Sequence, residues 1–112
     1  MRVRSIVPMF VGVLLSLVLG ACAGGDPNGT IQAVAVIDNG FSPATLTIAP
    51  GTTVSWSWAG FNPHDVRFTP ASGIPNSDVQ TVGSFQALFT TPGTYPYNCS
   101  LHISMTGTII VR

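Results

Sequence analysis

Residues 93–107 read Gly-Thr-Tyr-Pro-Tyr-Asn-Cys-Ser-Leu-His-Ile-Ser-Met-Thr-Gly, a strand pattern that runs into a loop rich in metal-ligating side chains. Tyr95, Tyr97 and Cys99 occupy alternate positions, which predicts a strand that carries all three side chains on one face. His102 and Met105 complete the pattern Cys-x2-His-x2-Met. Taken singly, such residues are usually a buried cysteine, a surface histidine and a core methionine. Together in one loop, they can turn toward one point.

A second histidine, His64, lies 35 residues before Cys99 in the segment Asn-Pro-His-Asp-Val. These two segments contain the only two histidines of the chain. One thiolate, two imidazoles and one thioether are the ligands of a blue-copper electron-transfer site, because thiolate and thioether favour Cu(I) while imidazole serves both oxidation states. Zinc also accepts cysteine and histidine but gains nothing from methionine. The sequence therefore predicts one copper ion bound by His64, Cys99, His102 and Met105.

The rest of the domain reads as short strands separated by turns. Val54, Trp56 and Trp58 alternate with serines, which predicts that both tryptophans face the core. Asn39-Gly40 and Ser42-Pro43 are read as breaks, and a short helix stays possible within residues 71–83. Strands are expected at residues 31–37, 45–49, 54–58, 65–69, 85–89, 95–99 and 108–111. Seven or eight such strands predict an all-β fold, a Greek-key β-sandwich or barrel.

The first 21 residues resemble an export signal of the lipoprotein type. Arg2 and Arg4 precede an apolar stretch of 14 residues, which is too short to span a membrane comfortably. Leu-Gly-Ala-Cys22 then resembles a bacterial lipobox, although an ordinary signal peptide with a chance cysteine stays possible. We expect lipidation at Cys22, a tether over residues 22–29 and one domain over residues 30–112. The domain would then face the periplasm or the cell exterior from a membrane surface.

The charge and the cysteine content limit which partners and ligands the chain can bind. Beyond residue 21 the chain has two arginines, four aspartates and no lysine or glutamate, so its net charge is −2. A chain with so little positive charge does not bind nucleic acid electrostatically. We expect the protein to be a monomer. If Cys22 carries lipid, Cys99 is the remaining thiol of an exported chain, where an unpaired cysteine is a liability unless it binds a metal.

The motif Gly93-Thr-Tyr-x-Tyr-x-Cys-x-x-His-x-x-Met-x-Gly107 resembles the cupredoxins, near the plastocyanin and amicyanin branch. The segment Ala-Gly-Phe-Asn-Pro-His-Asp-Val over residues 59–66 is similar to the first-histidine segment of plastocyanins, with Asn62 extra. The resemblance covers residues 31–112. It implies that His64, Cys99 and His102 are equatorial ligands and that Met105 is the axial ligand.

Three residues depart from the cupredoxin pattern. Leu101 stands where the family usually has proline, so its N–H can donate to the Cys99 sulfur and is expected to raise the reduction potential. Asp65 replaces a frequent asparagine; its N–H can still bond the thiolate, while its carboxylate would oppose that rise. Trp58 occupies the place of an asparagine that ties the ligand loops together, which leaves open how the His64 loop is braced.

Four apolar residues flank the predicted ligands: Phe61, Pro63, Leu101 and Ile103. Around an exposed edge of His102 they would form a docking rim for a redox partner, although they could be ordinary loop residues. Without rings of charge, docking should be weak and short-lived.

These features predict an electron carrier without catalysis of its own, which shuttles single electrons between redox proteins. The alternative is a copper-delivery protein, which the scarcity of methionine disfavours. A multicopper enzyme would need further histidines, and a Cys–His nucleophile would need an orienting residue and a substrate cleft.

Overall fold

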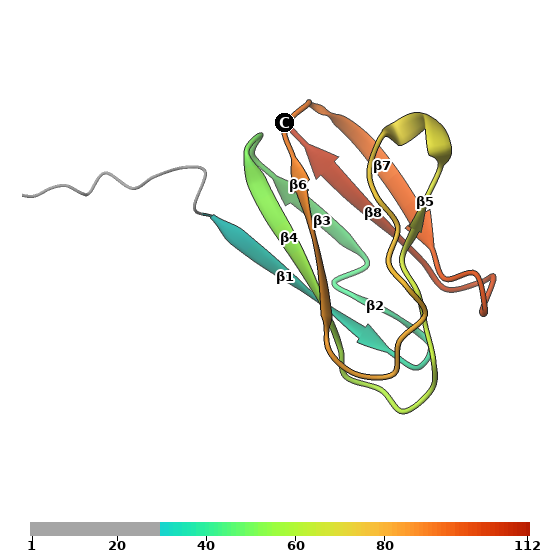
Figure 1. Cartoon of the computed structure of the whole chain (residues 1–112). Helices are drawn as coiled ribbons and strands as arrows, with labels where there is room; N and C mark the ends of the chain where they lie inside the picture. Colours follow the sequence, from blue (N-terminus) through green and yellow to red (C-terminus); the bar gives the residue numbers. More distant parts are fainter. Residues whose placement is uncertain (1–29) are drawn as a thin grey trace, which may run out of the picture.

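A computed structural model of the chain describes residues 30–112, which form two four-stranded sheets stacked in a sandwich (Figure 1). One sheet has the order β2-β1-β4-β6 and the other β3-β8-β7-β5. The strands are β1 (Ile31–Ile37), β2 (Gly40–Ser42), β3 (Thr45–Ile48), β4 (Thr52–Trp58), β5 (Arg67–Phe68), β6 (Ser84–Phe89), β7 (Gly93–Asn98) and β8 (Thr106–Val111). The all-β class is confirmed. The predicted signal peptide, the Cys22 lipidation site and the tether lie outside the described residues.

Strand β4 contributes large buried side chains from the first sheet to the core. It pairs parallel with β1 and antiparallel with β6, so it is hydrogen-bonded along both edges. Val54, Trp56 and Trp58 are buried, while Ser57 between the two tryptophans is exposed. The predicted inward face of both tryptophans is confirmed, since period-two alternation places them together on the core side.

The sequence reading missed strand β2. Asp38 and Asn39 form a two-residue turn, after which Gly40 pairs with Ile37 and the chain runs back along β1. Asn39-Gly40 was read as a break, but a two-residue turn such as Asp38-Asn39 is also the commonest connection in β-hairpins. Pro43 follows β2, where it no longer needs to donate a ladder hydrogen bond.

The connection between β5 and β6 contains one short 3-10 turn, η3 (Pro70–Ser72). It begins one residue before the segment where a short helix was left possible. The strand expected over residues 65–69 is confirmed only at Arg67 and Phe68. The connection then passes the segment that carries His64, where Gln80 forms an isolated antiparallel bridge with His64. This long segment is therefore anchored to the loop that carries the predicted ligand.

The hairpin β7–β8 is fitted closely around Tyr97. The ring of Tyr97 packs edge-on against Trp56 with centroids 5.5 Å apart, and its cross-strand neighbour is Gly107. A Cβ atom on Gly107 would lie 2.4 Å from Cζ of Tyr97, closer than any real Cβ contact. The absence of a side chain at Gly107 thus leaves room for the Tyr97 ring beside β8. Among residues 30–112, no helix has the length and apolar character needed to cross a membrane.

Candidate metal centre

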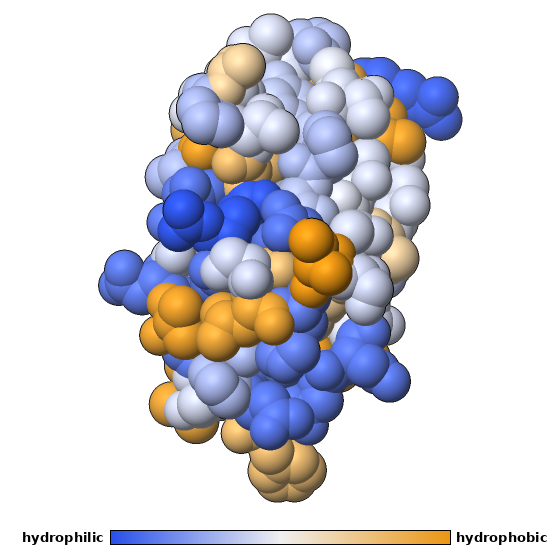
Figure 2. All heavy atoms as spheres, turned by 90° about the vertical axis from the view of Figure 1, so that its right-hand side faces the viewer, coloured by the Kyte–Doolittle hydropathy of each residue, from blue (hydrophilic) through white to orange (hydrophobic). Residues whose placement is uncertain are grey.

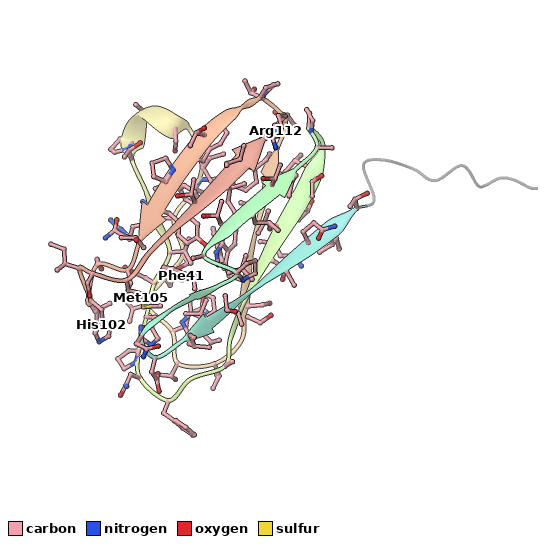
Figure 3. All side chains as sticks on the ribbon, turned by 180° about the vertical axis from the view of Figure 1, so that it is seen from behind. Phe41, His102, Met105 and Arg112 are labelled. Atoms are coloured by element: carbon pink, nitrogen blue, oxygen red, sulfur yellow. The ribbon has the colours of Figure 1, made fainter. Side chains whose placement is uncertain are left out.

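Two loops at one end of the sandwich meet to form the site. The β4–β5 connection carries His64, and the β7–β8 connection carries Cys99, His102 and Met105. Figure 3 shows His102 toward the outside of the molecule, Met105 further in, and Arg112 at the opposite end. The sandwich thus brings residues that are far apart in sequence to one place.

The geometry of three ligand atoms fits a single metal ion. Cys99 Sγ lies 3.8 Å from His64 Nδ1 and 3.7 Å from His102 Nδ1, and the three atoms lie within 4.8 Å of one another. Bonds of about 2.3 Å to sulfur and 2.0 Å to nitrogen, at angles of 110–120°, would separate S from N by roughly 3.5–3.7 Å. The observed S–N separations are close to these values. This donor set, one thiolate and two imidazoles, therefore fits a soft transition-metal ion.

The position of Met105 in the β7–β8 connection is fixed by backbone hydrogen bonds within that connection. The Cys99 N–H donates to the Met105 carbonyl at 3.0 Å, and the Met105 N–H donates to the His102 carbonyl at 2.8 Å. Met105 is 2% exposed and Cys99 is fully buried. The loop therefore closes on itself and keeps its thiol and thioether away from water.

His64 is fixed by its backbone. Its N–H donates to the Gln80 carbonyl at 3.0 Å, while its carbonyl accepts from Gln80 N–H at 2.9 Å and from Trp58 Nε1 at 3.1 Å. Its side chain is fully buried. The Trp58 bond provides part of the bracing of the His64 loop that the sequence left open, because the indole N–H donates to the His64 backbone.

Asp65 supplies a second brace. Its carboxylate accepts hydrogen bonds from the Ser100 N–H at 2.7 Å and from the Ser100 hydroxyl at 2.6 Å. Asp65 is buried, with 1% of its surface exposed. Arg67 Nε lies 4.0 Å from the same carboxylate. This carboxylate therefore joins the His64 loop to the Cys99 loop directly, one residue beyond each ligand.

Asp38 also contacts the site, and sequence reasoning missed it. Its Oδ1 lies 3.2 Å from His64 Nε2, and its carboxylate accepts the N–H groups of Phe61 and Asn62 at 2.9–3.1 Å. These bonds, first from Asn62, then Phe61 and then His64, lower the pKa of Asp38 below its ordinary value. No local motif could have revealed a contact across so many residues.

The predicted donors to the Cys99 sulfur remain predictions. Within residues 30–112, the polar contacts of Sγ are the two imidazole nitrogens, and the N–H groups of Leu101 and Asp65 are not among them. The side chain of Leu101 is 45% exposed.

The four residues of the predicted docking rim are exposed around the site. Phe61 is 92% and Ile103 89% exposed, Leu101 is partly exposed, and Pro63 is exposed. His102 between them is half-buried. Figure 2 shows apolar side chains gathered in the lower half of the face that carries the β7–β8 connection, bordered by hydrophilic residues. These are large apolar groups in contact with water.

The family model of copper binding proteins, plastocyanin/azurin family, matches residues 33–112. The chain is 36% identical over 85 residues to plastocyanin of Scenedesmus fuscus, covering 64% of this chain and 86% of that protein. It is 30% identical over 77 residues to amicyanin-alpha of Methylorubrum extorquens, covering 64% of each, slightly under two thirds of that relative.

Solved structures are similar as well. A novel purple cupredoxin from Nitrosopumilus maritimus superposes with a TM-score of 0.65 at 26% identity, covering 72% of this chain and 99% of that chain. A copper-containing nitrite reductase from Thermus scotoductus superposes with a TM-score of 0.67 at 28% identity, covering 86% of this chain and 25% of that enzyme.

A two-sheet sandwich that places a cysteine, two histidines and a methionine together at one end defines a cupredoxin site. The chain belongs to the plastocyanin/azurin family of copper-binding proteins, the cupredoxins. Copper is its cofactor, and His64, Cys99 and His102 bring three ligand atoms within 4.8 Å of one another, with Met105 in the same loop as Cys99 and His102.

Proposed function

We propose that this protein carries single electrons between redox partners at the outer face of a bacterial membrane. The observation that carries the proposal is the burial of Cys99 and His64 against each other, each 0% exposed, while His102 of the same site is half-buried near the surface. Copper, when bound, supplies a Cu(I)/Cu(II) couple. The chain supplies a dry, closely held ligand set with one ligand near solvent.

The two loops are built to change little between oxidation states. The backbone N–H and the carbonyl of His64 are both hydrogen-bonded. The Asp65 carboxylate accepts hydrogen bonds from the backbone N–H and the hydroxyl of Ser100. A ligand set that cannot relax toward the geometry preferred by either oxidation state lowers the reorganisation that accompanies electron transfer. Rigidity of these loops is therefore the chain's own contribution to rapid transfer.

His102 and its apolar surroundings are the proposed exit for the electron. Phe61, Pro63, Leu101 and Ile103 would pack against an apolar patch on the partner and bring the imidazole edge close to it. With two arginines and three aspartates in residues 30–112, charge adds little to this encounter. Docking should be weak and transient, as suits repeated turnover. A lipid on Cys22 would confine the protein to the membrane where its partners operate.

A Cys–His nucleophile is the enzymatic alternative that the site most resembles. Asp38 provides the orienting group for His64 that such a nucleophile requires. However, Cys99 and His64 are each 0% exposed, so a substrate cannot reach the thiol. The nitrite reductase likeness covers a quarter of that enzyme, and both histidines of this sequence are already in the one site.

Redox titration of the copper-loaded protein tests the proposal. We expect a reversible one-electron couple with copper retained through repeated cycles, and no couple in Cys99→Ser. A chelator challenge addresses the alternative of copper delivery: an electron carrier should lose Cu(I) slowly. Rapid transfer of Cu(I) to the chelator, or loss of metal on reduction, would favour delivery.

A further inference from the structure

Asp38 lies in the turn between β1 and β2, yet its carboxylate reaches the imidazole of His64. On that ring, Nδ1 is 3.8 Å from Cys99 Sγ, and Nε2 on the other side is 3.2 Å from Asp38 Oδ1. The His64 side chain is 0% exposed and that of Asp38 is 34% exposed. A buried imidazole thus lies between the metal-site sulfur and a partly exposed carboxylate.

The carboxylate determines which ring nitrogen carries the proton. A carboxylate accepts hydrogen bonds and donates none, so Nε2 must be the protonated nitrogen of neutral His64. Nδ1 is then left with its lone pair directed toward Cys99 Sγ. A metal ligand must present such a lone pair, so this hydrogen bond prepares His64 for copper before copper arrives.

The turn and the ligand loop are shaped to hold this carboxylate. The Phe61 N–H donates to both of its oxygens and the Asn62 N–H donates to Oδ1. A Cβ atom on Gly60 would lie 2.2 Å from Asp38 Oδ1 and 2.7 Å from its Cγ, so only glycine leaves room for the carboxylate there. Three consecutive residues of the loop, 60–62, therefore accommodate one side chain from a distant turn.

We propose that Asp38 is a positioning residue for the copper ligand His64, fixing its Nε2–H tautomer and stabilising the oxidised site. The proposal rests on the proposed function, because it concerns the metal affinity and potential of that site. A negative charge on the far side of the imidazole makes Nδ1 a stronger donor and favours the more positive copper ion. Asp38 thereby tightens Cu(II) binding and lowers the reduction potential.

The first test uses the metal-free protein and nitrogen-15 NMR of the histidine rings. In the wild type, His64 should show one tautomer with the proton on Nε2. Asp38→Ala should give a mixture of tautomers, whereas Asp38→Asn keeps an acceptor oxygen and should retain the Nε2–H form. A wild-type His64 with its proton on Nδ1, or an unchanged tautomer in Asp38→Ala, would overturn the proposal.

The second test measures Cu(II) affinity by competition and the reduction potential of the loaded protein. Asp38→Ala should weaken Cu(II) binding by about 10- to 100-fold, the usual cost of removing a hydrogen-bond partner of a histidine ligand, and should raise the potential. Gly60→Ala, which displaces the carboxylate but keeps its charge, should shift both in the same direction. Asp78→Asn removes one charge from an exposed aspartate elsewhere and serves as the control.

Equal shifts in Asp38→Ala and Asp78→Asn would contradict the proposal, because they would show an effect of net charge alone. Asp38→Asn keeps the acceptor for the loop N–H groups, so it tests the charge even if the alanine variant folds poorly. The NMR result needs no copper. A fixed Nε2–H tautomer in a protein without a reversible copper couple would therefore support the role of Asp38 and overturn the proposed function instead.

Discussion

The two loops that form the copper site are organised in opposite ways. The β7–β8 loop holds Cys99, His102 and Met105 through hydrogen bonds within seven residues of its own backbone. The β4–β5 loop holds a single ligand. Apart from the Asp65–Ser100 bonds that join the two loops, it is fixed by Trp58 at the end of β4, by Gln80 and by Asp38 in the turn after β1. One loop is therefore a local ligand cluster, whereas the other is placed by the tertiary fold. Changes to each loop should consequently fail in different ways.

The largest expected effect on stability comes from a change in the β7–β8 hairpin. Gly107→Ala would place a Cβ atom 2.4 Å from the Tyr97 ring, which aromatic packing against Trp56 keeps from moving away. Overpacking of a core usually costs about 1–3 kcal/mol, and we expect at least the upper end of that range here. Urea unfolding of the metal-free domain measures it. Tyr97→Leu in the same chain should restore part of the loss, and an undiminished stability of Gly107→Ala would show that the hairpin is not closely fitted.

Breaking the connection between the two loops should come next. Asp65→Ala removes the acceptor of two short hydrogen bonds and leaves the Ser100 N–H without its partner, at a cost of about 2–3 kcal/mol. Asp65→Asn keeps an acceptor oxygen and should cost less. Ser100→Ala removes only the hydroxyl donor and should cost about 1 kcal/mol. If all three variants unfold at the same urea concentration as the wild type, the loops are not tied through Asp65.

The sequence carried unequal information about the two loops for the same physical reason. Cys-x2-His-x2-Met is a spacing within one segment, so the ligands of the β7–β8 loop could be predicted with the strands beside it. His64 could be proposed because it is one of two histidines in the chain. Its support by Asp38 could not, because that contact depends on the hairpin turn after β1, which was read as a break. Hydrogen bonds between distant loops have no signature in spacing.

A smaller effect on stability, confined to the β4–β5 loop, is expected when the Trp58 hydrogen bond is removed. Trp58→Phe removes the indole donor to the His64 carbonyl, which still accepts from the Gln80 N–H. We expect a loss of about 1–2 kcal/mol, together with faster amide hydrogen exchange in residues 60–66. Exchange in residues 99–105 should change little. Equal acceleration in both loops would mean that they move as one unit, contrary to the comparison.

The smallest effect at neutral pH is expected for Tyr97→Phe. Within the described residues the buried Tyr97 hydroxyl has no hydrogen-bond partner, so its removal should be close to neutral. Burial raises the pKa of Tyr97 to about 12 from 10.0, and the nearby Trp56 indole opposes this rise in part.

The raised pKa makes stability depend on alkaline pH. The unfolded chain loses the Tyr97 proton first, so this contribution is complete below pH 10 and is lost as pH rises toward about 12. The loss amounts to about 2–3 kcal/mol, and Tyr97→Phe should not show it. Urea unfolding from pH 8 to pH 12 measures the difference, with Tyr95→Phe as the matched control because its hydroxyl bonds the Thr91 carbonyl. An identical alkaline decline in Tyr97→Phe would assign the effect to other groups.

The visible spectrum of the protein loaded with one equivalent of Cu(II) tests the copper site most directly. Coordination by the Cys99 thiolate with His64, His102 and Met105 predicts an intense blue colour that disappears in Cys99→Ala and returns as the wild type is reoxidised after reduction. A colourless or weakly coloured Cu(II) complex of the wild-type chain would contradict the account, because it would show that Cys99 does not bind the copper.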